Sequence, residues 1–96
     1  MPTYIRLTEL TREGFEEIEE SATRTEHMKA MANEMGGSIE DVFLTMGEYD
    51  FITIAEFPND QMYTQFALRF AEEGTNDTKT LKALEEDEYL SVIQQL

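Results

Sequence analysis

The chain has 96 residues, 41% hydrophobic and 10% aromatic, which suffices for one core but not for two independent ones. Asp and Glu number 21 against 7 Lys and Arg, giving a formal net charge of -14. Nucleic acids and anionic membrane surfaces are bound by clustered basic residues, and the sequence has no such cluster, so we expect neither partner. An acidic excess of this size favours solubility through self-repulsion and also occurs in organisms with a salty interior.

The sequence contains no cysteine, which rules out disulfides, thiolate catalysis and cysteine-ligated zinc. It opens without a signal-peptide pattern, and no apolar run approaches the ~18 residues of a membrane span. We therefore expect a cytoplasmic protein with a single domain over residues 1–96.

The first half of the chain predicts a strand followed by a long helix. Residues 3–10 alternate in polarity, with Ile5 and Leu7 on one face of the strand. Thr11 is a natural N-cap for the helix that follows, and Gly36-Gly37 ends that helix. The apolar phase drifts near residues 21–23, so we expect a bend or a short break there.

The second half predicts three strands and two helices. Residues 38–46 and 51–57 form a hairpin joined by residues 47–50, and a helix follows Pro58 and ends at Gly74. Residues 77–84 form a fourth strand, and an acidic first turn at residues 86–88 opens a short last helix.

The element order is βαββαβ with a C-terminal helix, which is typical of a ferredoxin-like α+β fold with a four-stranded antiparallel sheet. In this fold both long helices cover one face of the sheet. Here the two central hairpin strands are apolar at both parities, so the second face also needs a cover. A second copy of the sheet would form a dimeric α+β barrel. The alternative is that the C-terminal helix folds over this face.

A set of polar side chains has the strand parity that we assign to the second face. A half-buried cation there needs a partner or an anion, and hydroxyl groups beside it are typical of a small-molecule pocket, although a wet dimer seam would look the same. These residues are Arg6, Thr8, Thr45, Thr53, Thr80 and Lys82.

The hairpin carries a family resemblance. Residues 45–51 read Thr-Met-Gly-Glu-Tyr-Asp-Phe, which resembles the T-x-G-x-Y-D core of the GYD domain family. The opening residues 2–5, the Gly36-Gly37 turn and residues 78–81 are also similar to that family. The resemblance implies a ferredoxin-like dimeric α+β barrel of uncharacterised biochemical function. Family members often carry Pro near the first-helix break, where this chain has Ser21-Ala22.

A comparable hairpin occurs in the effector-binding domains of Lrp/AsnC-type regulators, which also pair as dimers. Those regulators bind DNA through a separate helix-turn-helix, and this chain has no room for one.

Two interpretations of the hairpin stay open. Gly47 permits a positive φ or a close backbone approach, and Asp50 can accept turn amides or act as a base if it is desolvated. In the functional interpretation, Tyr49 and Asp50 face the mouth of a pocket and Arg6 clamps an anion. In the structural interpretation, which we favour, Asp50 locks the turn and Tyr49 packs at the dimer seam.

No motif predicts a metal or a cofactor. His27 is the only histidine, and its place on the helical wheel is away from the apolar stripe. The acidic runs lack calcium-loop spacing, and the methionines lie at helical core spacing.

Two functions are therefore considered. The first is a homodimeric small-ligand-binding or interaction module. The second is a small cofactor-independent enzyme, monooxygenase- or isomerase-like, with its site at the barrel cleft, an idea that rests on fold analogy. The candidate ligand-binding residues are Arg6, Thr8, Thr45, Tyr49, Asp50 and Lys82.

Overall fold

A computed structural model describes all residues from 1 to 96. The strands are β1 (Thr3–Leu10), β2 (Ser38–Leu44), β3 (Phe51–Glu56) and β4 (Asn76–Ala83). The helices are α1 (Arg12–Glu16), α2 (Ser21–Glu34), α3 (Asp60–Ala71) and α4 (Glu86–Gln94), with a 3₁₀ turn, η1 (Ile18–Glu20), between α1 and α2.

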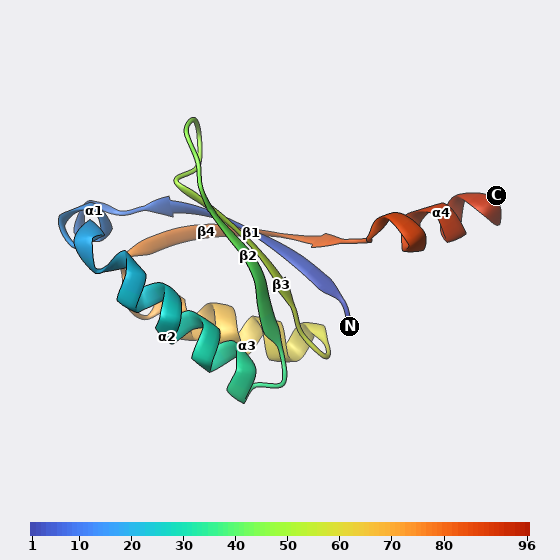
Figure 1. Cartoon of the computed structure of the whole chain (residues 1–96), viewed down its shortest axis with the longest axis horizontal. Coiled ribbons are helices and arrows are strands. Elements are labelled where there is room, and N and C mark those ends of the chain that lie inside the picture. Colours follow the sequence, from blue (N-terminus) through green and yellow to red (C-terminus); the bar gives the residue numbers. More distant parts are fainter.

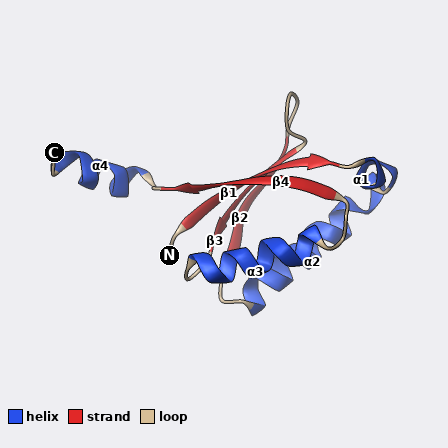
Figure 2. Cartoon of the chain, turned by 180° about the vertical axis from the view of Figure 1, so that it is seen from behind, coloured by secondary structure: helices blue, strands red, loops and turns tan.

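The four strands form one antiparallel sheet in the order β2-β3-β1-β4, with β1 paired to both β3 and β4. Helices α2 and α3 lie side by side on one face of the sheet (Figures 1 and 2). The predicted ferredoxin-like α+β fold is confirmed.

Local signals explain where the helices begin and end. The side chains of Thr11 and Asn59 accept hydrogen bonds from the backbone amides of Gly14 and Met62, so both residues act as N-caps. Gly36, with φ +80°, follows α2 and allows the left-handed turn that leads into β2.

The break in the first helical segment lies earlier than predicted. The backbone leaves helical geometry at Glu17 (φ -107°, ψ 20°), and α2 is regular from Ser21 onward, so residues 21–23 are not the bend. The chain changes direction between α1 and α2 (Figure 1), because α1 is held against the loop before β4 while α2 runs along the sheet.

The core lies between the sheet and helices α2 and α3, and it is mainly aromatic. The rings of Tyr4 and Tyr63 stack with centroids 4.3 Å apart, and Phe66 contacts both Phe57 and Phe70 at about 5 Å. Burial of such rings is the main source of stability in a domain of this size. The fully or nearly buried members are Tyr4, Met28, Ala32, Ala55, Phe57, Tyr63, Phe66 and Phe70.

The opposite face of the sheet is uncovered and mainly apolar, with Lys79 and Asp41 on its outer strands. In the strand register, Ile5 lies beside Ile54 and Leu81, and Leu7 lies beside Ile52, so these side chains share one face. Phe43 extends the patch onto β2. We call this surface the open face: Ile5, Leu7, Phe43, Ile52, Ile54 and Leu81.

Helix α4 does not fold over the open face. It projects beyond the end of the sheet (Figures 1 and 2), and every residue from Leu84 to Leu96 is exposed. The alternative in which the C-terminal helix covers this face is therefore wrong for the single chain. None of the helices is both long enough and apolar enough to cross a membrane.

The prediction that the polar strand residues lie on the second face of the sheet is wrong. Arg6, Thr8 and Thr53 are buried beneath the helices, and Thr80 hydrogen-bonds to the Tyr63 hydroxyl of α3. The alternation along β1 was predicted correctly, but its assignment to the two faces was inverted. The open face is therefore the apolar one, and the polar residues belong to the helix-covered side.

Candidate functional site

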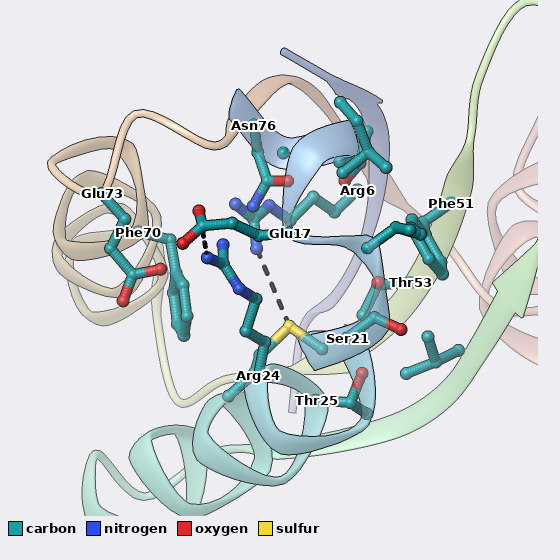
Figure 3. Close-up of a pocket in the computed structure, with 16 residues that line it drawn as sticks. Arg6, Glu17, Ser21, Arg24, Thr25, Phe51, Thr53, Phe70, Glu73 and Asn76 are labelled. Carbon is teal, nitrogen blue, oxygen red and sulfur yellow. Dashed lines mark hydrogen bonds and ion pairs between the residues drawn. The ribbon is translucent and has the colours of Figure 1, made fainter. Parts of the chain in front are cut away.

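A cavity of about 70 Å³ lies between the sheet and the segment that runs from α1 into α2 (Figure 3). Its floor is formed mainly by residues of the two central strands, including Arg6, Thr8 and Thr53, and its roof by η1 and α2. Phe70 closes the side toward α3. The lining combines hydroxyl groups, apolar side chains and two arginines, which is the composition of a small-ligand site.

Arg6 is the central charged group of this cavity. Its side chain is 3% exposed, its Nε has no hydrogen-bond partner, and its Nη1 contacts only the sulfur of Met28, at 3.8 Å. The guanidinium carbon lies 5.4 Å from the ring centroid of Phe70 and 5.9 Å from that of Phe66. Burial lowers the pKa of Arg6, yet the delocalised guanidinium is basic enough to keep its proton at physiological pH.

A second arginine at the cavity is already paired. Arg24 on α2 donates to the Glu17 carboxylate at 2.7 Å, across the break between α1 and α2 (Figure 3). The other carboxylate in the lining, Glu73, favours the charged form of Arg6 through space but forms no ion pair with it. Arg6 is thus the cation of the cavity without a bonded counter-charge.

The roof of the cavity is held in place by contacts at the end of β1. The Thr11 amide donates to the Thr75 carbonyl at 3.0 Å, and the Thr11 hydroxyl donates to the Gly74 carbonyl at 2.9 Å. A Cβ atom at Gly14 would lie 2.3 Å from the Thr75 carbonyl oxygen, so only glycine allows α1 to approach this closely.

The hairpin between β2 and β3 is fastened to β1. Asp50 accepts a hydrogen bond from the Leu10 amide at 2.8 Å through its carboxylate, and its own amide donates to the Thr8 carbonyl at 2.8 Å. Within the loop, the Thr45 hydroxyl donates to the Tyr49 carbonyl at 2.5 Å. Gly47 has φ +121°, a conformation that side chains disfavour. These bonds anchor Thr45 within the loop and Asp50 to β1.

Lys82 belongs to a separate cluster at the start of α3. Its ammonium lies 2.9 Å from Asp60, which also accepts a hydrogen bond of 2.5 Å from the Tyr4 hydroxyl. Burial and this hydrogen bond raise the pKa of Tyr4 to about 12. The Tyr4 hydroxyl and the Lys82 ammonium lower the pKa of Asp60.

The profile of the GYD domain family matches residues 4–93. The chain belongs to the GYD domain family. It is also 27% identical over 85 residues to a protein of Thermus thermophilus named glutamine synthetase and cystathionine beta-lyase binding protein, a match that covers 88% of this chain and 90% of that one. No solved structure matches the chain significantly.

The structure brings together only part of the predicted set. Arg6 and Thr8 line the cavity of this GYD chain, whereas Thr45, Tyr49, Asp50 and Lys82 do not. Tyr49 and Asp50, which the functional interpretation placed at the mouth of a pocket with Arg6, do not line this cavity.

The sequence reasoning missed Arg24 and Glu17. On an unbroken helix a separation of seven residues is about two turns, further than the i,i+3 and i,i+4 positions that interact, so this pair depends on the break at Glu17 and left no local pattern in the sequence. His27 is exposed, with its ring centroid 6.0 Å from that of Phe70. Glu85, Asp87 and Glu88 form an exposed acidic group at the start of α4, where they supply the capping box and suit the helix dipole.

Proposed function

We propose that this GYD-family chain is a homodimeric interaction module of the cytoplasm, in which the open face packs against the open face of a second copy. The observation that carries the proposal is the uncovered apolar face itself. Leu81 and Phe43 are each 52% exposed on it, and contiguous exposed apolar patches mark interfaces in soluble proteins. A two-fold axis through the sheet would cover both copies with the same residues.

Helix α4 supports a second copy as the occupant. A helix of nine residues is marginal on its own in water, and α4 exposes Tyr89, Leu90, Val92 and Ile93. A standard interface uses about 20 to 30 residues per side, more than the open face alone supplies. Contact between α4 and the other copy adds the missing surface.

Charge does not oppose this arrangement at the centre of the interface. Each copy carries a formal net charge of -14, but the apolar centre of the open face is flanked by one charge of each sign, Lys79 beside Leu7 and Asp41 beside Ile54. The repulsion between copies then acts over longer distances, where salt screens it. We expect the dimer to tighten as ionic strength rises.

Sedimentation equilibrium tests the dimer. Leu81→Asp places a charge on the open face and is expected to give a monomer at concentrations where the wild type is dimeric. Leu68→Asp is the matched control, because Leu68 is similarly exposed, at 61%, but lies on α3 outside the open face. A monomeric wild type, or equal dissociation in both variants, would contradict the proposal.

We further infer that the dimer binds a metabolic enzyme, as the name of the Thermus thermophilus relative states for that protein. The acidic outer surface would steer association toward a basic patch on the enzyme, and with such a partner the on-rate falls with salt. Surface plasmon resonance with purified glutamine synthetase and with cystathionine beta-lyase measures this directly. Absence of binding to both enzymes would contradict this part of the proposal and leave the dimer test unaffected.

A further inference from the structure

The cavity beneath the helices holds a buried charge that the chain does not neutralise. Removal of an ion from water is costly even after the protein relaxes, and contact with an aromatic ring offsets only part of that cost. Arg6 has the two ring contacts, but its Nε donor has no acceptor and its Nη1 contacts only a thioether. The charge of the guanidinium is therefore only partly stabilised by its surroundings, and its Nε–H is available to donate a hydrogen bond to a ligand.

The neighbouring carboxylates do not supply the missing counter-charge. Glu17 is held by Arg24 at 2.7 Å, and Glu73 is an exposed residue that forms no ion pair with Arg6. The Glu17–Arg24 pair also holds η1 against α2 and so keeps the cavity roof in place. An anion that enters the cavity would meet Arg6 as its free cation.

The size and lining of the cavity limit what that anion is. A volume of about 70 Å³ is about half of the ~150 Å³ that accommodates benzene, so it admits a compact molecule of only a few non-hydrogen atoms. Thr8 and Thr53 line the same cavity as Arg6 with hydroxyl-bearing side chains, while Val42, Phe51 and Met28 supply apolar surface. A guanidinium binds a carboxylate through parallel hydrogen bonds, and the apolar wall suits a short hydrocarbon tail.

We propose that this cavity binds a short-chain monocarboxylate, with the carboxylate on the Arg6 guanidinium and the hydrocarbon end against Phe51 and Val42. The site is formed within one chain and does not depend on the proposed dimer. Arg6 acts as the binding residue, Thr8 and Thr53 offer donors to the second oxygen, and Met28 and Phe70 exclude water from the charge pair.

The test follows the Nε–H signal of Arg6 by ¹H–¹⁵N NMR during titration with sodium propionate. Propionamide at the same concentration, with sodium chloride added to match the ionic strength, is the neutral control. We expect propionate to shift this signal saturably and propionamide to leave it in place. An unmoved signal, an equal response to propionamide, or an equal response to inorganic phosphate would each overturn the proposal.

Two variants separate binding from a structural role of Arg6. Arg6→Met keeps the volume and removes the charge, so we expect saturable propionate binding to be lost while the ligand-free Tm rises or stays the same. Because this variant has no Nε–H, binding to the variants is followed through the backbone amide signals of Thr8 and Thr53, which line the cavity. Lys29→Met removes an exposed cation from α2 outside the cavity and should bind propionate as the wild type does. A lower ligand-free Tm in Arg6→Met, with propionate binding retained, would show that Arg6 is only structural.

The monomeric variant Leu81→Asp completes the design. It should still bind propionate, because the cavity is lined by residues of one chain. The two proposals, the dimer and the carboxylate site, can therefore be refuted independently of each other.

Discussion

The two faces of the sheet differ in polarity, and the difference is the reverse of what their environments lead one to expect. The helix-covered face buries Arg6, Thr8 and Thr53, while the face without any helix presents isoleucines and leucines. A polar group under helices is tolerated where it has hydrogen-bond partners or a ligand, and an apolar face in solvent is tolerated where another protein surface covers it. Each face is thus incomplete in its own way, one lacking a counter-charge and the other a cover.

The largest expected effect is a difference in the free energy of unfolding between a substitution under the helices and one on the open face. Phe66→Ala removes a fully buried ring beneath the helices and should cost about 3–5 kcal/mol in free energy of unfolding at any protein concentration. Phe43→Ala on the open face should cost less, and its cost should shrink as the protein is diluted and dimers dissociate. Urea unfolding at two protein concentrations measures both; a concentration-independent loss in Phe43→Ala would remove the distinction.

A smaller effect is expected at the hairpin that ties β3 to β1. Asp50→Ala leaves the Leu10 amide without its acceptor, which should cost about 1–3 kcal/mol. Asp77→Ala, an exposed aspartate at the start of β4, should change stability by less than about 0.5 kcal/mol. If the two variants unfold at the same urea concentration, the structural role of Asp50 is wrong.

Tyr4 makes the covered face sensitive to high pH. Its pKa is about 12 in the folded chain against 10.0 for an ordinary tyrosine, so the unfolded chain releases this proton first and stability falls as pH rises from 10 toward 12. Below pH 10 both states keep the proton and the stabilisation is complete. Tyr4→Phe should lower stability by about 1 kcal/mol at pH 8 and show a shallower decline above pH 10.

Urea unfolding at pH 8 and at pH 11 checks this difference in slope. Tyr89→Phe on the exposed α4 is the control and should follow the wild type at both pH values. An identical slope in wild type and Tyr4→Phe would mean that another group governs the alkaline range.

The smallest effect is expected for the ion pair at the start of α3. Lys82 and Asp60 are both mainly exposed, so Lys82→Met should cost about 0.2–1 kcal/mol, and the difference should vanish in 1 M salt. Lys29→Met, which removes an exposed lysine of α2 without an ion pair, gives the baseline. A cost above about 2 kcal/mol would show that the pair is more buried than the structure has it.

The sequence predicted the features that depend on near neighbours. The limits of β1, the Thr11 cap and the turn at Gly36 follow from patterns within a few residues, and the structure has all three. The order of elements then led to the ferredoxin-like sheet, because few topologies accommodate βαββαβ.

The features that were missed depend on residues far apart in the chain. Alternation along β1 shows that two faces exist, but it does not say which face the helices cover when the central strands are apolar at both parities. The Asp50–Leu10 bond joins positions 40 apart, and the break at Glu17 accompanies the close approach of Gly14 to Thr75. Neither pairing leaves a local pattern that identifies its partner.

The central place of β1 in the sheet also bears on how the chain folds during synthesis. β1 is translated first, yet its partners β3 and β4 begin only at Phe51 and Asn76, so at ~5–20 residues per second it waits for several seconds without pairing. An unpaired apolar strand can associate with other nascent chains during that time. A charge at Arg6 in the middle of the strand opposes such association. The residue whose burial is costly in the folded core therefore lowers the tendency of the nascent chain to aggregate.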